Sequence, residues 1–184
     1  MNSKNIIVLL GILSFSLACK NDKTENKVEE NKPAVKENFS VELDVMASKK
    51  DDFSFYYTED NTIAFTGDMA MWHGVVGNNT REKINYDMSP EKIPTDIRLD
   101  FGMNKEQDSV KLYNVKVAYY GNEISIKGNE FFNYFIESKD FKTVVDNSEG
   151  CLKIYKNGAD YKTPFFYPRQ ELIDAIKKLT TTTK

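Results

Sequence analysis

The stretch Phe39-Ser40-Val41-Glu42-Leu43-Asp44-Val45 decides the fold class of this chain. Its apolar side chains stand at every second position, which places one face of an extended strand in a core and the other face in water. An amphipathic helix would instead need apolar residues three and four positions apart. The stretch therefore predicts a half-buried β-strand at the start of a folded domain.

Short runs of the same kind continue along the chain and are separated by turn residues. The runs are Phe53–Tyr57, Ile63–Phe65, Met69–Val76, Ile84–Met88, Ile97–Phe101, Val110–Tyr120 and Ile124–Ile126. The turn signals are Gly67-Asp68, Gly77-Asn78-Asn79, Ser89-Pro90, Gly121-Asn122 and Gly128-Asn129. Many short strands at this spacing predict an all-β fold, an antiparallel β-sandwich of jelly-roll type.

Two local features refine this prediction. In the run 110–120 the apolar phase slips between Leu112 and Tyr113, which predicts a β-bulge. Near residues 168–180 the spacing changes to that of a helix, because the apolar residues now fall on one helical face; they are Leu172, Ile173, Ile176 and Leu179. Pro168 is suited to start this helix, which we expect to pack on the sandwich. The aromatic segment 131–136 gives no clear type.

The N-terminus has the pattern of an export signal. Lys4 precedes an apolar run over residues 6–17 that is shorter than the roughly 20 residues a membrane-spanning helix needs. Ser16-Leu17-Ala18-Cys19 resembles the lipobox of bacterial lipoproteins. That resemblance implies cleavage of residues 1–18, lipid on Cys19 and, with Lys20 next, an outer-membrane location. The alternative is a buried N-terminal helix in which Cys19 only packs.

Residues 19–38 differ in composition from the domain that follows. Their lysines and acidic residues are equal in number and no aromatic residue occurs, so the segment has little apolar surface to bury. We expect a flexible tether over 19–38 and one β-sandwich domain over 39–184; a helical tether is the alternative. Removing residues 1–18 changes the net charge from −3 to −4, which gives no basis for binding nucleic acid.

Residues for catalysis are few in the expected mature chain. It holds one histidine, His73, and one cysteine besides Cys19, namely Cys151. Cys151 is either a small buried residue or a reactive thiol. Glu42-Leu43-Asp44-Val45 resembles the start of the Glu-x-Asp-x-Glu motif of jelly-roll glycoside hydrolases, which work with two carboxyl groups. Met46 and Ala47 stand where the second glutamate should be, so we expect no enzyme and a solvent-facing strand.

One internal stretch points to a binding function. Ile97-Arg98-Leu99-Asp100-Phe101-Gly102, with the strand from Val110 to Val115, resembles the jelly-roll, carbohydrate-binding-like modules of bacterial surface-polysaccharide proteins. Arg98 and Asp100 either pair structurally or contact a ligand. The oxygens of Asp100, Asn104, Glu106 and Asp108 either hold a structural calcium ion or belong to a solvated loop. We expect no other cofactor and no metal centre.

Aromatic residues supply the remaining candidates. In the pair Tyr56-Tyr57 a regular strand turns one ring outward. Trp72-His73, ahead of Gly74, is the most suitable solvent-facing cluster, with Tyr56 and Tyr57 beside it across a hairpin. Three functions follow: a membrane-anchored glycan-binding module, an envelope interaction or assembly protein that binds no small ligand, and a hydrolase. The missing pairs of catalytic residues disfavour the hydrolase.

Overall fold

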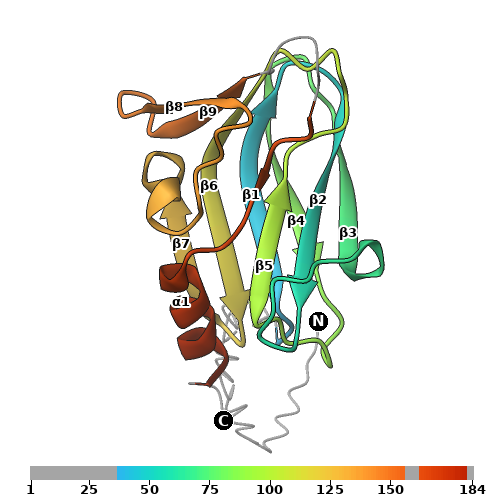
Figure 1. Cartoon of the computed structure of the whole chain (residues 1–184), viewed down its shortest axis with the longest axis vertical. Helices are drawn as coiled ribbons and strands as arrows, with labels where there is room; N and C mark the ends of the chain where they lie inside the picture. Colours follow the sequence, from blue (N-terminus) through green and yellow to red (C-terminus); the bar gives the residue numbers. More distant parts are fainter. Residues whose placement is uncertain (1–36, 156–161, 182–184) are drawn as a thin grey trace, which may run out of the picture. The chain divides into compact units, whose positions relative to one another are not determined.

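The computed structural model describes residues 37–155 and 162–181, which form two antiparallel β-sheets and one C-terminal α-helix (Figure 1). The strands are β1 (Ser40–Ala47), β2 (Asp51–Thr58), β3 (Ala70–Val75), β4 (Thr80–Asp87), β5 (Asp96–Asp100), β6 (Ser109–Tyr119), β7 (Asn122–Lys127), β8 (Lys142–Asp146), β9 (Cys151–Tyr155) and β10 (Phe165–Phe166). The helices are two 3₁₀ segments, η1 (Gly67–Met69) and η2 (Gly128–Asn133), and the helix α1 (Gln170–Thr181). The expected all-β sandwich with a C-terminal helix is confirmed.

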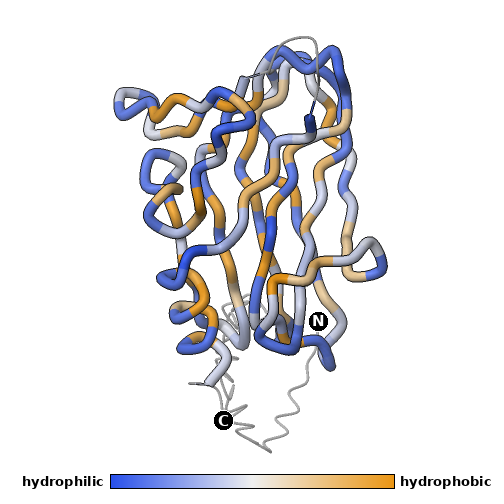
Figure 2. Tube along the Cα trace, viewed as in Figure 1, coloured by the Kyte–Doolittle hydropathy of each residue, from blue (hydrophilic) through white to orange (hydrophobic). Residues whose placement is uncertain are grey.

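The larger, six-stranded sheet is built around β1 and β6. Its order is β4-β1-β6-β9-β8, and β7 pairs with the part of β6 that β9 leaves free. The alternation in β1 works as predicted, since Val41, Leu43 and Val45 are buried. Hydrophobic and hydrophilic residues alternate along the strands in Figure 2, as expected when one face of a sheet covers a core.

The predicted bulge lies at Tyr113. Opposite β1, Asp44 pairs with Asn114 and the next residue, Val45, pairs with Leu112, so Tyr113 is the extra residue. Tyr113 and Asn114 are both half-buried, whereas Leu112 and Val115 are fully buried on the core face. The bulge therefore keeps apolar residues pointing inward on both sides of the slip.

The smaller sheet has four strands in the order β10-β5-β2-β3. The connection from β2 to β3 corrects one expectation, because Ile63–Phe65 is not a strand. Ile63 is 59% exposed, and Phe65 packs against Tyr167 with 5.7 Å between ring centroids. The run is short and unpaired. Its large ring, Phe65, lies 5.6 Å from the Arg98 guanidinium on the outer face of the sheet, and this connection passes in front of β2 in Figure 1.

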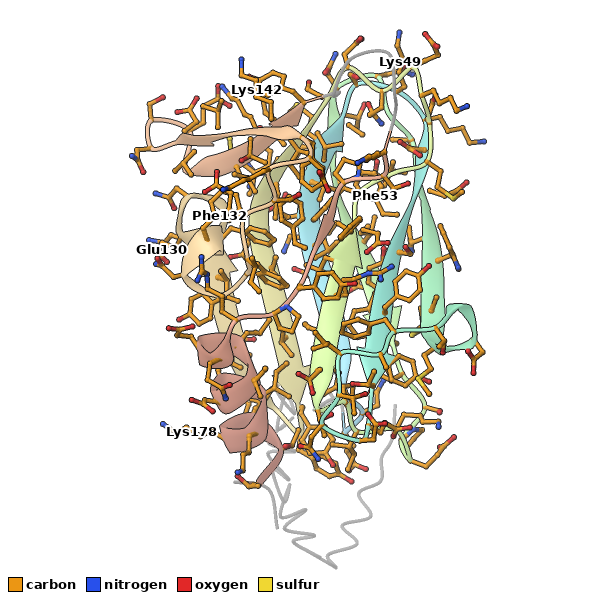
Figure 3. All side chains as sticks on the ribbon, viewed as in Figure 1. Lys49, Phe53, Glu130, Phe132, Lys142 and Lys178 are labelled. Carbon is orange, nitrogen blue, oxygen red and sulfur yellow. The ribbon has the colours of Figure 1, made fainter. Side chains whose placement is uncertain are left out.

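The core between the sheets is unusually aromatic around β10. The ring of Phe166 lies 5.1 Å from Phe131, 5.2 Å from Phe141 and 5.8 Å from Phe101, each nearly edge to face. Phe132, labelled in Figure 3, approaches the same ring at 6.1 Å. The aromatic segment 131–136 thus lies partly in the 3₁₀ helix η2 and partly beyond it, where Phe135 forms a bridge with Pro168. Its rings join β10 to the rest of the core.

The C-terminal helix packs on β6 and β7 through Leu172, Ile176 and Leu179, which are buried. It begins at Gln170, so the proposed start at Pro168 is wrong. Pro168 instead forms an isolated bridge with Phe135. The backbone carbonyl of Arg169 accepts the first helical hydrogen bonds. Among the described residues no helix has the length and apolarity to cross a membrane. The proposed signal and nearly all of the proposed tether lie outside the described residues.

Candidate ligand-binding face

The outer face of the four-stranded sheet gathers four of the six residues proposed for ligand binding. Core residues of β2, β3 and β5 point inward, so the alternate residues point outward. Trp72 pairs in register with Ser54, and Tyr56 pairs with Arg98. The rings of Tyr56 and Trp72 meet edge to face, with centroids 6.4 Å apart and planes at 70°. Trp72 remains 50% exposed, so this face offers an indole ring to solvent.

Arg98 is the centre of this face. Its guanidinium lies 4.1 Å from the ring centroid of Tyr56, which is cation–π geometry. It also donates two hydrogen bonds to Asp100, from Nε to Oδ1 and from Nη2 to Oδ2, each 2.8 Å long. This bidentate geometry is specific to arginine. Arg98 and Asp100 therefore pair with each other, as one of the two interpretations predicted.

Three further rings surround the Arg98 guanidinium. Their centroids lie 5.5 Å away for Phe165, 5.6 Å for Phe65 and 5.7 Å for Tyr167. Phe65 belongs to the β2–β3 connection, whereas Phe165 and Tyr167 belong to the C-terminal chain. Arg98 thus joins two remote segments to the sheet, and no short-range sequence pattern marks this.

The Arg98–Asp100 pair is largely removed from water, with side-chain exposures of 16% and 9%. Burial raises the pKa of Asp100 above its ordinary value, although the hydrogen bonds and charge of Arg98 act in the opposite direction. Burial also opposes the charged form of Arg98, but the hydrogen bonds with Asp100 and Tyr167 outweigh it and raise the pKa of Arg98. Arg98 is therefore charged at neutral pH, and its charge and hydrogen bonds favour the ionised form of Asp100 against the effect of burial.

A buried hydroxyl lies between these groups. Ser54 pairs in register with Trp72 on one side and Asp100 on the other, and it is 1% exposed. Its Oγ has no hydrogen-bond partner among the described residues. Unpartnered buried polar atoms are uncommon in folded proteins. Ser54 was missed in the sequence, because a lone serine in an aromatic strand carries no signal.

Tyr57 and His73 lie on the opposite face of the same sheet. The ring of Tyr57 stacks on Phe55 with centroids 6.1 Å apart, and the His73 ring meets Tyr86 edge to face at 6.2 Å. The reason is the period of the strand, since neighbours in sequence point to opposite sides. The cluster expected from Trp72 and His73 together is therefore divided, and only Trp72 joins Tyr56 on the outer face.

The carboxylates of the hydrolase-like motif are held in ion pairs on the outer face of the six-stranded sheet. Glu42 accepts a hydrogen bond from Lys83 at 2.9 Å. Asp44 accepts two from Arg81, at 2.7 and 2.8 Å, and that guanidinium lies 3.8 Å from the ring centroid of Tyr113. Each acid thus faces solvent and a cation, which is the arrangement expected of a solvated strand face.

The loop proposed for calcium is organised by Asp51, which the sequence analysis did not single out. This buried carboxylate accepts hydrogen bonds from Met103 N at 2.7 Å, Asn104 N at 3.0 Å and Gln107 Nε2 at 3.1 Å. A Cβ at Gly102, where φ is +94°, would lie 2.2 Å from Asp51 Oδ2.

Two of the four proposed calcium ligands are used in other contacts. Asp100 pairs with Arg98, and the Asn104 side chain bonds the backbone of Lys50 and Glu106. Within 37–155 and 162–181 no group of three or more His, Cys, Asp or Glu side chains could hold a metal.

Cys151 is fully buried, with its Sγ 3.9 Å from Glu149 Oε2. Burial raises the pKa of its thiol, so the unreactive protonated form predominates at neutral pH. The structure therefore supports the packing interpretation of Cys151 over the reactive one.

Comparison with known proteins adds no relative: no family model, no curated protein and no solved structure matches this chain. The resemblances to lipoprotein signals and to carbohydrate-binding-like modules thus remain predictions from the residues quoted above.

Proposed function

We propose that this chain is a lipid-anchored extracytoplasmic protein that binds a glycan, without catalysis, on the outer face of its four-stranded sheet. The observation that carries the proposal is the half-exposed Trp72, supported at its edge by Tyr56, whose other neighbour is Arg98. An indole ring held by a rigid sheet loses little conformational freedom when a ligand binds.

The chemistry of the face suits a sugar. The apolar side of a pyranose ring stacks on an aromatic plane, and its hydroxyl groups need polar partners nearby. Trp72 supplies the plane, and Arg98, whose side chain keeps 16% of its exposure, is the charged group in a nearby row of the same face. One stacked ring contributes about 1 kcal/mol beyond area burial, by analogy with aromatic pairs. Useful affinity therefore needs a longer glycan that also contacts the neighbouring rings.

An exposed tryptophan is also the residue type that most often dominates protein–protein interfaces. The second candidate function is therefore an envelope interaction or assembly protein, with Trp72 as its central contact. Binding to a glycan array distinguishes the two candidates.

Binding to the glycan array is measured for three forms of the mature protein: the wild type and two variants. We expect the wild type to bind a set of oligosaccharides and Trp72→Ala to lose that binding. Tyr120→Asn is the matched control, because Tyr120 is an aromatic residue of similar exposure, 43%, in the β6–β7 turn, and asparagine tolerates its positive φ. Equal loss in both variants, or no glycan bound by the wild type, would count against the proposal.

The anchor is tested at Cys19. We expect radiolabelled palmitate to enter the wild type and to be absent from Cys19→Ala, because the thiol of Cys19 is the proposed acceptor. Fractionation of the envelope should place the labelled wild type in the outer membrane, as Lys20 suggests. Equal labelling of both proteins would show that Cys19 is not the site.

A further inference from the structure

The strand β8 has a free edge. In the part of the chain that the structure describes, it is the last strand of its sheet and pairs only with β9. No backbone hydrogen bond joins Lys142–Asp146 to any other described part of the chain. In Figure 1 the β8–β9 hairpin protrudes beside β6, and Figure 3 labels Lys142 on it. Half of the N–H and C=O groups of β8 are thus open to pairing with another strand.

The edge at β8 lacks the protection that the other edges of the six-stranded sheet have. The edge strand β4 carries consecutive charged residues at 81–83, and the edge of β7 lies beside α1. In β8 the two central residues, Val144 and Val145, are each 39% exposed. Because neighbours in a strand point to opposite faces, the centre of this edge is apolar on both faces. Such an edge is suited to strand addition.

The sequence of β8 is complementary to itself. When two copies run antiparallel about Val144, residue 142 faces residue 146, 143 faces 145, and 144 faces 144. Lys142 of each copy then lies opposite Asp146 of the other, so both ends of the pair carry opposite charges. Asp146 keeps its own hydrogen bond from Lys153, at 2.6 Å, and the second cation adds to it. Strands with like charges at these positions would be disfavoured.

We propose that β8 binds the β8 strand of a second copy of this chain, antiparallel and with Val144 opposite Val144, so that the two six-stranded sheets become continuous. The partner is fixed by the backbone edge, the apolar centre and the complementary ends together. This pairing is independent of glycan binding, because Trp72 belongs to the other sheet.

Disulfide trapping with the full chain tests the register, in cells treated with an added thiol oxidant that accepts the two electrons released as the disulfide forms. In the proposed pair the Cα atoms of the two Val144 residues lie about 5 Å apart, within the range that a disulfide spans. The two Val145 residues are offset by two positions, which separates their Cα atoms by about 8 Å, beyond that range. We therefore expect Val144→Cys to give a band at twice the monomer mass on a non-reducing gel, and this band should disappear on reduction. Val145→Cys and the wild type should give no such band.

Two further variants complete the test. Thr143→Cys combined with Val145→Cys should restore the dimer band, because residue 143 faces residue 145. Adding Lys142→Glu to Val144→Cys should lower the yield several-fold, since glutamate would face Asp146. The proposal is overturned if Val144→Cys stays monomeric, if it links to a protein of another mass, or if Val144→Cys and Val145→Cys cross-link equally. The wild type controls for Cys19 and Cys151.

Discussion

Phe166→Ala is expected to lower the free energy of unfolding by about 3–5 kcal/mol, the usual cost of removing a buried aromatic ring. Phe166 is fully buried, and its ring joins β10 to η2 and to Phe101, the residue that follows β5. The chain continues from β10 into α1, so the loss should also loosen the helix. Because domains of this size are stable by only about 5–15 kcal/mol, the change is large.

Urea unfolding of residues 37–184 measures this effect, since the hydrophobic core formed by the described residues runs from Phe39 to Leu179. Phe165→Ala is the matched control. It removes the same ring from the neighbouring position, which is only half-buried and faces outward near Arg98. We expect Phe165→Ala to cost about a third as much free energy of unfolding as Phe166→Ala, because the ring of Phe165 buries less apolar area. Equal losses would show that the aromatic core does not centre on Phe166.

Arg98→Met is expected to cost about 3 kcal/mol at neutral pH, near the lower end for breaking a buried ion pair, because Arg98 keeps some contact with water. The substitution leaves the Asp100 carboxylate buried without its cation and removes the guanidinium from four aromatic rings. Arg98→Lys should be intermediate, because lysine keeps the charge but cannot form the bidentate contact.

The loss caused by Arg98→Met should depend on pH in a defined direction. Burial already raises the pKa of Asp100, and without Arg98 nothing opposes that rise. A carboxyl group whose pKa is raised in the folded state favours folding below its unfolded pKa, and this contribution is lost as pH rises through the folded pKa. The variant should therefore lie closer to wild type near pH 4 than at pH 7.

Asp100→Asn in the Arg98→Met background provides the control, because it removes the unpaired charge. The double variant should recover part of the stability at pH 7. A pH-independent loss, or no recovery in the double variant, would contradict this account of the pair.

The fold was predictable from the sequence where one face of a strand is buried and the other is exposed to solvent. Alternation located β1, and the slip at Leu112-Tyr113 located the bulge, because a buried face fixes the register. The strands β8 and β9 were missed for two reasons. The apolar run of β8 is very short, because Lys142 and Asp146 stand at its two ends, and Lys153 interrupts the apolar run of β9. β10 has only two residues, which is too few to show any period.

The candidate site was predictable only in part. The pairing of Arg98 with Asp100 follows from their spacing of two on one strand, and the separation of Trp72 from His73 follows from the same period. The roles of Phe65 and Tyr167 around Arg98 could not be predicted, because they depend on how a loop and the C-terminal chain cross the sheet. Local patterns carry no information on such contacts.

The most direct test of the central claim is the fluorescence of Trp72, the only tryptophan in the chain. The mature protein is titrated with acrylamide, alone and with an oligosaccharide that it binds on the array. We predict ready quenching in the free protein, since half of the side chain is exposed, and protection when the oligosaccharide is bound. Glycan binding that leaves the quenching of Trp72 unchanged would contradict the account.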